Sequence, residues 1–306
     1  MPSHLSSRDA ALALLVVFIW GTNFVVVRWG LDMLPPLFMA ACRFALVLCP
    51  AIFFLKKPDV PWRFLAIYGG AVGTGQFGLL YIAMDGFISP GIASVVMQTQ
   101  VFFTIAIAMR RSGDRLAVHH VLGLLPAAVG LVVIGLHTGE GITAVGLVMV
   151  LGGALCWAIS NQATREAVAH AAARGQSINP LAFVVWGAIF AMLSLFAGSL
   201  VLEGPALIRQ SVATAHWAIW ATLVWQSAAN TLFGYTMWAW LLGRYPAASI
   251  VPITLLVPVF GIGASVLVLN EPLQDWKITA TLLVMAGVAI NILWRPRKIL
   301  AEGEAA

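Results

Sequence analysis

Long apolar runs separated by short polar segments fill almost the whole chain of 306 residues. Each run is roughly 20 residues long, the length at which an α-helix spans a hydrocarbon core of about 30 Å. A membrane β-barrel would instead show alternating strands of roughly ten residues. The pattern therefore predicts an all-α polytopic membrane protein. Its ten transmembrane helices, numbered spans 1 to 10, are expected at residues 10–29, 36–55, 64–84, 90–109, 119–137, 142–163, 180–201, 215–242, 247–268 and 276–294.

The chain also repeats itself. Residues 89–136, shifted by 157 positions, lie without gaps on residues 246–293. Both copies begin with small residues, break at a short polar patch that holds an acid, and continue through a matched glycine, Gly130 or Gly287. Internal repeats of this kind indicate a duplicated structural unit. We expect two five-helix repeats, at 10–137 and 142–294, between an N-terminal tail (1–9) and a basic C-terminal tail (295–306).

The basic residues favour one orientation. If the N-terminus is cytoplasmic, thirteen Lys and Arg residues lie in inside segments and three, Arg28, Arg209 and Lys277, lie outside. Basic residues collect in cytoplasmic loops, so both termini are expected in the cytoplasm of a bacterial inner-membrane protein. Because each repeat has an odd number of spans, the second repeat would be inserted upside down. The matched loops agree, since 110–115 is basic and 270–275 is acidic.

Composition supports a membrane protein and argues against other classes. The chain is 61% hydrophobic and 9% charged, whereas soluble proteins carry about 25% charged residues. The first apolar run has no small-residue cleavage site, so we expect no removed signal peptide. The three cysteines lie inside apolar runs without metal or disulfide spacing. The basic pI of about 9.4 is explained by cytoplasmic loops, and we expect no nucleic-acid partner, catalytic residue, metal or cofactor.

Several motifs resemble a known family. The segment 19–28 (IWGTNFVVVR), followed by Pro35-Pro36 and Arg43-Phe44, is similar to the opening of EamA-type members of the drug/metabolite transporter superfamily. In the second half, 255–259 (LLVPV) followed by 270–273 (NEPL) is similar to the same family. The likeness covers about residues 10–294, and the chain resembles bacterial exporters of cysteine, O-acetylserine and aromatic amino acids. One departure is Gly113-Asp114, where the family commonly has Gly-Glu; the charge is kept.

This resemblance implies a fold and an activity. The family fold has two inverted five-helix repeats, in which helices 1–4 and 6–9 surround a central cavity and helices 5 and 10 brace the periphery. Spans 5 and 10 are almost wholly apolar, whereas spans 1, 3, 4, 6 and 8 carry nearly all the intramembrane amides. The activity implied is export of amino acids and related small metabolites by alternating access.

Polar and aromatic side chains at membrane depth are the candidates for substrate binding, because such groups are costly in lipid and face protein or water. Arg43 either attracts a substrate carboxylate, pairs across the outer mouth during gating, or extends to the outer interface. Gln98 and Gln100 are two residues apart on a helix and should point in different directions. Amides suit a zwitterion, since they donate and accept; alternatively, amides and tryptophans only pack or bond to neighbouring helices. The candidates are Trp20, Asn23, Arg43, Gln76, Tyr81, Gln98, Gln100, Trp157, Asn161, Trp186, Gln226, Asn230, Tyr235 and Trp238.

Two prolines are candidates for a hinge. Pro252 and Pro258 interrupt the hydrogen-bond ladder of span 9, and the matched positions in the first half are Val95 and Val101. Span 9 is therefore expected to be more kinked than span 4.

Every Asp and Glu lies in a terminus, a loop or at a span end. Proton-coupled pumps and exporters of cationic drugs normally keep an intramembrane acid. The substrate is therefore expected to be neutral, zwitterionic or anionic, carried by facilitated diffusion or by proton antiport. The alternatives are an exporter of aromatic or cationic drugs, a membrane enzyme and a non-transporting sensor; the scattered titratable residues disfavour the enzyme.

Overall fold

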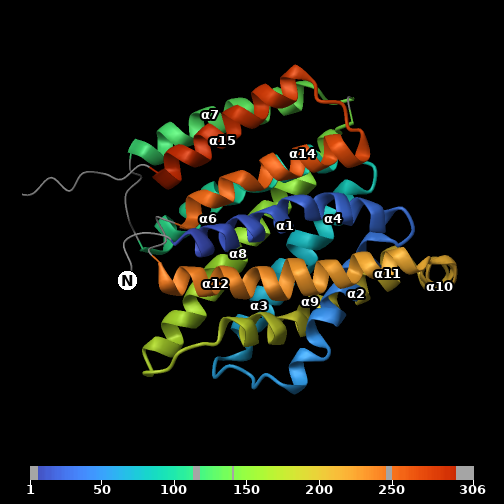
Figure 1. The fold of residues 1–306 in the computed structure, drawn as a ribbon. Coiled ribbons are helices and arrows are strands. Elements are labelled where there is room, and N and C mark those ends of the chain that lie inside the picture. Colours follow the sequence, from blue (N-terminus) through green and yellow to red (C-terminus); the bar gives the residue numbers. More distant parts are fainter. Residues whose placement is uncertain (1–5, 113–117, 140, 246–249, 294–306) are drawn as a thin grey trace, which may run out of the picture.

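The computed structural model describes residues 6–112, 118–139, 141–245 and 250–293, and over these residues it is a bundle of helices with one isolated β-bridge between Ile88 and Ile142 (Figure 1). The prediction of an all-α protein is confirmed. The helices are α1 (Ser7–Leu31), α2 (Pro36–Leu48), α3 (Trp62–Gly70), α4 (Leu79–Met84), α5 (Pro90–Val96), α6 (Gln100–Ser112), α7 (Val118–Leu136), α8 (Ala144–Ala172), α9 (Pro180–Leu202), α10 (Pro205–Thr214), α11 (Trp217–Val224), α12 (Gly234–Arg244), α14 (Val257–Leu269) and α15 (Asp275–Leu293).

Nine helical stretches within the described residues are long and apolar enough to cross a membrane. They are Ser7–Leu31, Pro36–Phe53, Trp62–Met84, Pro90–Arg111, Val118–Leu136, Ala144–Ala172, Pro180–Leu202, Val251–Leu269 and Asp275–Leu293. These stretches coincide with nine of the ten predicted spans, and the largest difference is at span 6, which continues to Ala172 instead of ending near 163. The predicted span 8 is missing from the nine, although α11, a π-helical segment and α12 form continuous helix across it. Its amides and tryptophans make it less apolar than the others.

The backbone departs from the α-helix at matched positions of the two halves. Spans 3 and 8 contain π-helical segments, Ala71–Gly78 and Trp225–Phe233. Spans 4 and 9 contain 3-10 segments, Met97–Thr99 and Val251–Leu256. Such interruptions free backbone groups and are frequent at functional sites. The longer 3-10 segment is in span 9, which contains Pro252 and Pro258, but span 4 is interrupted as well, without a proline.

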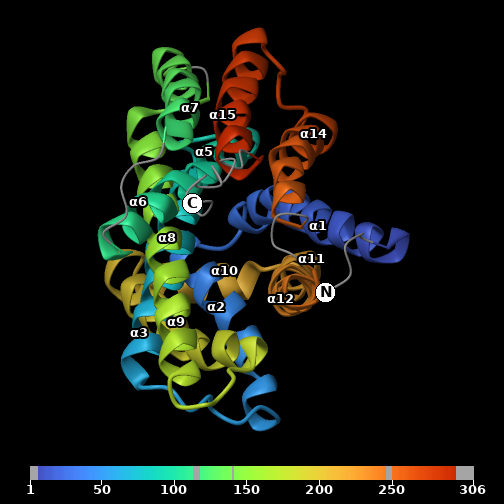
Figure 2. The ribbon, with the colours of Figure 1, turned by 90° about the vertical axis from the view of Figure 1, so that its left-hand side faces the viewer.

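Helices α7 and α15 form an antiparallel pair. His120 Nδ1 is 2.9 Å from Asn291 Oδ1, and His137 stacks on Trp276 at the other end of the pair. Glycine allows the close approach, because a Cβ on Gly287 would lie 2.3 Å from the carbonyl oxygen of Gly123. The pair lies at one edge of the molecule in both views (Figures 1 and 2). This position agrees with the peripheral place that the resemblance implies for spans 5 and 10.

The remaining helices of the two halves interlock. Helix α1 of the first half packs along α14 of the second, and α8 of the second half packs along α6 of the first. Helices α2 and α9 run antiparallel, since Leu37 contacts Glu203 at one end and the Trp186 indole reaches the Leu55 carbonyl at the other. The main apolar core lies around α2 and includes Met39, which is fully buried. Helices from both halves therefore enclose the space between them.

Candidate functional site

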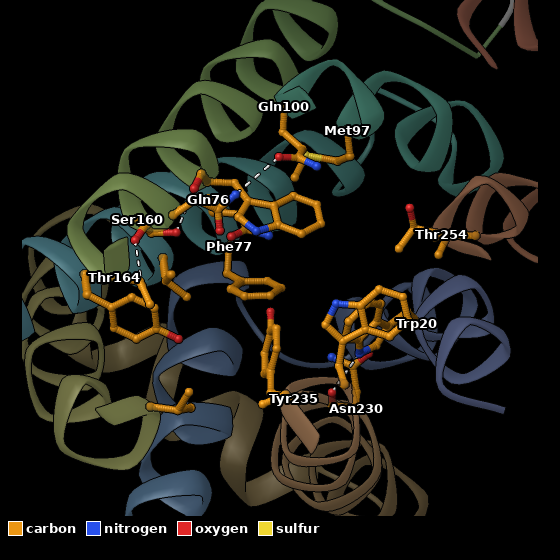
Figure 3. A pocket seen from close by; sticks show the side chains of 18 of the residues that line it. Trp20, Gln76, Phe77, Met97, Gln100, Ser160, Thr164, Asn230, Tyr235 and Thr254 are labelled. Carbon is orange, nitrogen blue, oxygen red and sulfur yellow. Dashed lines mark hydrogen bonds between the residues drawn. The ribbon is translucent and has the colours of Figure 1, made fainter. Parts of the chain in front are cut away.

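A cavity of about 470 Å³ lies among spans 1, 3, 4, 6, 7, 8 and 9 (Figure 3). Among the described residues, no side chain of α7 or α15 lines it, and none of the lining residues is charged. Of the predicted site residues, the lining includes Trp20, Asn23, Gln76, Gln98, Gln100, Trp157, Asn161, Asn230, Tyr235 and Trp238. Arg43, Tyr81, Trp186 and Gln226 are outside the lining. Trp20 and Asn23 of the first half and Trp157 and Asn161 of the second half thus face a common space.

The cavity is open at one end of the molecule and closed at the other. At one end its lining includes Val168, near the end of α8, and Pro180, the first residue of α9, and both are exposed. At the other end its lining includes Val27, Leu80 and Ser94, which are all buried. The loop between α8 and α9 lies at the same end of the molecule as the N-terminus (Figure 1). The open end is therefore the end at which the chain begins.

One wall of the cavity is aromatic. The Trp20 indole donates a hydrogen bond from Nε1 to the Asn230 carbonyl oxygen (3.1 Å), in the π-helical segment of span 8. Its ring packs against Tyr235 and Trp238, with ring centres 5.6 and 5.3 Å apart. Gly234 makes this approach feasible, because a Cβ there would lie 2.6 Å from Trp20 Nε1. Figure 3 shows Trp20, Tyr235 and Asn230 together on this wall.

Three of the amides are tied to neighbouring helices. Gln98 Nε2 donates to the Thr254 carbonyl oxygen (3.0 Å), which joins the 3-10 segments of spans 4 and 9. Asn161 Nδ2 donates to Gln100 Oε1 (3.3 Å). Both Gln98 and Gln100 line the cavity, although their spacing predicts different directions. The 3-10 segment Met97–Thr99 changes the helical spacing between them.

Two other amides have an unused acceptor. Asn23 and Gln76 are buried, with 6% and 4% of their surface exposed. Within the described part of the chain, neither Asn23 Oδ1 nor Gln76 Oε1 accepts a hydrogen bond. Both residues line the cavity. Buried acceptors are normally satisfied. Because both oxygens are themselves buried, either side chain must reorient before its oxygen can accept a donor from a molecule in the cavity.

Arg43 is fully buried, with 0% of its surface exposed, so it does not extend to the membrane interface. Its Nη1 donates to Tyr81 Oη (2.9 Å), and its Nη2 and Nε donate to Thr231 Oγ1 (2.8 and 3.3 Å). The Tyr81 hydroxyl in turn donates to Gln226 Oε1. Tyr81 and Gln226 therefore hold Arg43 in a buried network behind the cavity wall.

Phe77 separates this network from the cavity. The Arg43 guanidinium lies 3.9 Å from the centre of the Phe77 ring, and Phe77 lines the cavity. No carboxylate forms an ion pair with Arg43 within the described ranges. A cation–π contact and neutral hydrogen bonds thus stabilise a buried positive charge, which is costly without them. Its field acts on the adjacent cavity, since screening by water is weak there.

The other predicted residues have different surroundings. Trp186 donates from Nε1 to the Leu55 carbonyl oxygen (2.9 Å) and packs against Trp62, outside the cavity. Pro252 is the second residue of the 3-10 segment of span 9, and Pro258 is the second residue of α14. The loop position Asp114 lies outside the described residues. The sequence interpretation missed several lining residues, namely Phe24, Tyr68, Phe77, Ser94, Met97, Ser160, Thr164, Phe183 and Thr254; proximity to a mid-span amide was an available signal for Phe77.

Comparison with known proteins assigns the family. The model of the EamA-like transporter family matches the chain twice, at residues 8–136 and 144–293. The chain belongs to the EamA-like transporter family. It is therefore a multi-pass membrane transporter of small molecules and not an enzyme, as the motifs predict.

Two relatives of this EamA-like transporter are similar over nearly their whole length. A protein named "Probable amino-acid metabolite efflux pump" from Escherichia coli (strain K12) is 35% identical, over 95% of this chain and 98% of that protein. A protein of the same name from Salmonella typhimurium (strain LT2) is 37% identical, over 94% and 96%. A crystal structure with 18% sequence identity matches with a TM-score of 0.59, over 94% of this chain and 97% of the other. That likeness concerns the fold alone.

Proposed function

We propose that this transporter exports amino acids and related small metabolites from the cytoplasm by alternating access. The cavity carries the proposal: it combines aromatic walls with neutral amides, lies between the two halves and is closed at one end. Small-molecule sites generally have this composition, with few polar groups that fix orientation. The names of the relatives from E. coli and S. typhimurium support the same substrate class.

The polar groups suit the two ends of a zwitterion. The Asn23 and Gln76 side-chain oxygens, which are buried and lack donors, would accept from a substrate ammonium group once the side chains reorient toward the cavity. The Arg43 cation, behind Phe77, would attract the carboxylate. A buried cation next to the cavity favours an amino acid over a cationic drug, because like charges repel in a weakly screened site.

We infer that the two halves are inverted repeats of five spans each, and that residues 217–244 form the tenth membrane span. Antiparallel pairing of α7 with α15 and of α2 with α9 supports this arrangement, because an axis within the membrane plane reverses equivalent helices. The matched π and 3-10 segments and the double match of the family model support a duplication.

The membrane orientation follows from the basic residues. From their distribution we infer that the protein lies in a bacterial inner membrane with both termini in the cytoplasm. The open end of the cavity is then cytoplasmic, and the conformation faces inward. An exporter binds its cytoplasmic substrate in an inward-facing conformation. We propose that transport then proceeds by facilitated diffusion or in exchange for protons.

Flux into proteoliposomes tests the proposal. Purified protein would be reconstituted and assayed with a panel of radiolabelled amino acids, with and without an imposed pH gradient. We expect saturable flux of at least one amino acid above that of protein-free liposomes. Equal flux with and without the gradient indicates facilitated diffusion, and gradient-dependent flux indicates antiport. The proposal would be contradicted if the reconstituted protein transported none of the amino acids and also bound none of them.

A further inference from the structure

At the closed end of the cavity, a carboxylate of the second half caps a helix of the first half. Glu203, which follows α9, accepts hydrogen bonds from the backbone N–H groups of Leu37 (Oε1, 2.6 Å) and Phe38 (Oε2, 3.0 Å). Ser199 Oγ donates to the same carboxylate (2.6 Å). Helix α2 begins with Pro36, which has no N–H, so Glu203 takes the first two available donors of that helix.

A second carboxylate makes the equivalent contact on span 4. Glu271, which follows α14, accepts from the Gly91 backbone N–H (Oε2, 3.2 Å) and from Ser89 Oγ (Oε1, 2.5 Å). Span 4 also begins with a proline, Pro90. Lys277 is 4% exposed and lies 2.9 Å from Glu271 Oε1. A Cβ on Gly91 would lie 3.0 Å from Glu271 Oε2, so glycine favours this approach and a larger residue would displace the carboxylate by a few tenths of an ångström.

Both contacts lie at the same end of the molecule and both join the halves. The connections from α9 to α10 and from α14 to α15 are at the end opposite the N-terminus (Figure 1). At the open end, the described helix α9 is capped within its own half: Asn179 Oδ1 accepts from the backbone N–H groups of Leu181 (3.0 Å) and Ala182 (3.3 Å). The two halves are also joined at the open end, but there the ion pairs of Arg174 with Asp59 (2.5 Å) and of Arg111 with Glu166 (3.2 Å) involve exposed or partly exposed side chains and cap no helix start. Carboxylates of the second half cap helix starts of the first half at the closed end.

We propose that Glu203 and Glu271 are the two latches that hold the closed end of this transporter shut. Their bonds are suited to repeated opening, since carboxylate and N–H groups are both well hydrated when they separate, and charge-assisted bonds reform with defined geometry. An opening at this end must move the starts of spans 2 and 4 away from the second half, and therefore breaks both contacts. The inference rests on the proposed function only in that the cavity opens alternately to the two sides.

Accessibility of a reporter cysteine from the closed side tests the latches. Cys42, Cys49 and Cys156, which are free, would be replaced by serine, and Val27→Cys, in the buried end of the cavity, would be labelled with a membrane-impermeant maleimide. The full-length protein would be reconstituted in proteoliposomes, and the closed and open sides labelled separately. We expect Glu203→Gln and Glu271→Gln each to raise closed-side labelling about tenfold, because each weakens two or more charge-assisted bonds, and the double variant to raise it further.

Asn179→Ala is the matched control, since it removes a helix cap within one half and should leave closed-side labelling unchanged. Gly91→Ala keeps both carboxylates, displaces Glu271 and should also raise the labelling rate. Parental elution from a size-exclusion column and parental labelling from the open side would show that Glu203→Gln and Gly91→Ala are folded. If these folded variants also label from the closed side at the parental rate, the proposal is overturned. The proposal is also overturned if Asn179→Ala raises closed-side labelling as much as Glu203→Gln and Glu271→Gln do. Labelling needs no substrate, so absence of amino-acid flux would overturn the proposed function and leave the latches intact.

Discussion

The guanidinium of Arg43 lies 3.9 Å from the ring centre of Phe77, and the same ring lines the cavity. A fully buried positive charge is thus separated from the substrate space by one aromatic side chain. Tyr81 and Thr231 hold the guanidinium in place from behind. We propose that this arrangement favours substrates with a carboxylate without exposing an arginine to water, and that rotation of Phe77 would bring the charge into the cavity.

Replacing Arg43 tests this electrostatic role. We expect Arg43→Met, which keeps an unbranched apolar stem and removes the charge, to lower the flux of carboxylate-bearing substrates at least about tenfold, since two unit charges about 8 Å apart interact by roughly 2 kcal/mol at an effective dielectric constant of about 20. Flux in proteoliposomes at equal protein amount is the measurement. The control is Arg28→Met, which removes a partly exposed pair with Asp32 (3.0 Å) and should change flux little. Equal flux in the two variants would rule out the role of Arg43.

The unpartnered amide oxygens predict recognition of an ammonium group. Gln76→Met and Asn23→Leu keep similar volumes and remove the acceptors, so each should raise the KM for an amino acid about tenfold. The KM for a desamino analogue, which has no ammonium group, should not change. Gln98→Met serves as a comparison, because the Gln98 amide bonds to the Thr254 carbonyl oxygen and its loss should affect both ligands alike. A parallel rise for amino acid and desamino analogue in Gln76→Met would contradict the assignment.

The Thr231 hydroxyl should contribute to stability through the π-helical segment of span 8. Its Oγ1 donates to the Gln226 carbonyl oxygen (2.9 Å) and accepts from Arg43. Thr231→Val leaves both groups without this partner and should lower the free energy of unfolding by about 1–3 kcal/mol. In Thr222→Val, the lost hydroxyl donates only to the Ile219 carbonyl oxygen (2.7 Å), and the loss should be smaller. Thermal unfolding in detergent, followed by circular dichroism, compares the two.

The contact between α7 and α15 should be intolerant of a methyl group. Gly287→Ala would place its Cβ 2.3 Å from the Gly123 carbonyl oxygen, and overpacking of this kind costs about 1–3 kcal/mol. Gly135→Ala in α7 meets its nearest neighbour, Leu147 Cδ2, at 4.0 Å and should be neutral or stabilising, because alanine favours helix. Opposite signs of the change in thermal midpoint are therefore expected, and a stabilising Gly287→Ala would refute the tight contact.

Reporter fusions test the orientation. Green fluorescent protein fused after residue 306 or before residue 1 should fluoresce in both cases, because it folds in the cytoplasm. The same protein fused within the predicted outer segment 138–141 should be dark. A dark C-terminal fusion at normal expression, together with a fluorescent N-terminal fusion, would exclude the even number of spans that the proposal requires.

The apolar pattern predicted most of the helices, because lipid requires long apolar stretches with internally satisfied backbones. It placed nine spans to within a few residues, apart from the extension of α8 to Ala172. Trp20, Asn23, Trp157 and Asn161 were among the candidates chosen because polar and aromatic side chains at membrane depth face protein or water, and all four line the cavity. The equal irregularity of spans 3 and 8 was not predicted, because π segments leave no regular trace in side-chain type.

The sequence by itself determined the class of protein, the spans, the family and most of the polar residues that face the cavity, because these depend on local composition and helical spacing. The tertiary structure decided which polar side chains are used up by protein partners. It placed Arg43 behind Phe77, left Asn23 and Gln76 with free acceptors, and brought Glu203 and Glu271 to helix starts more than 160 positions away in the chain. Such pairings depend on how distant helices pack, and no local pattern records them.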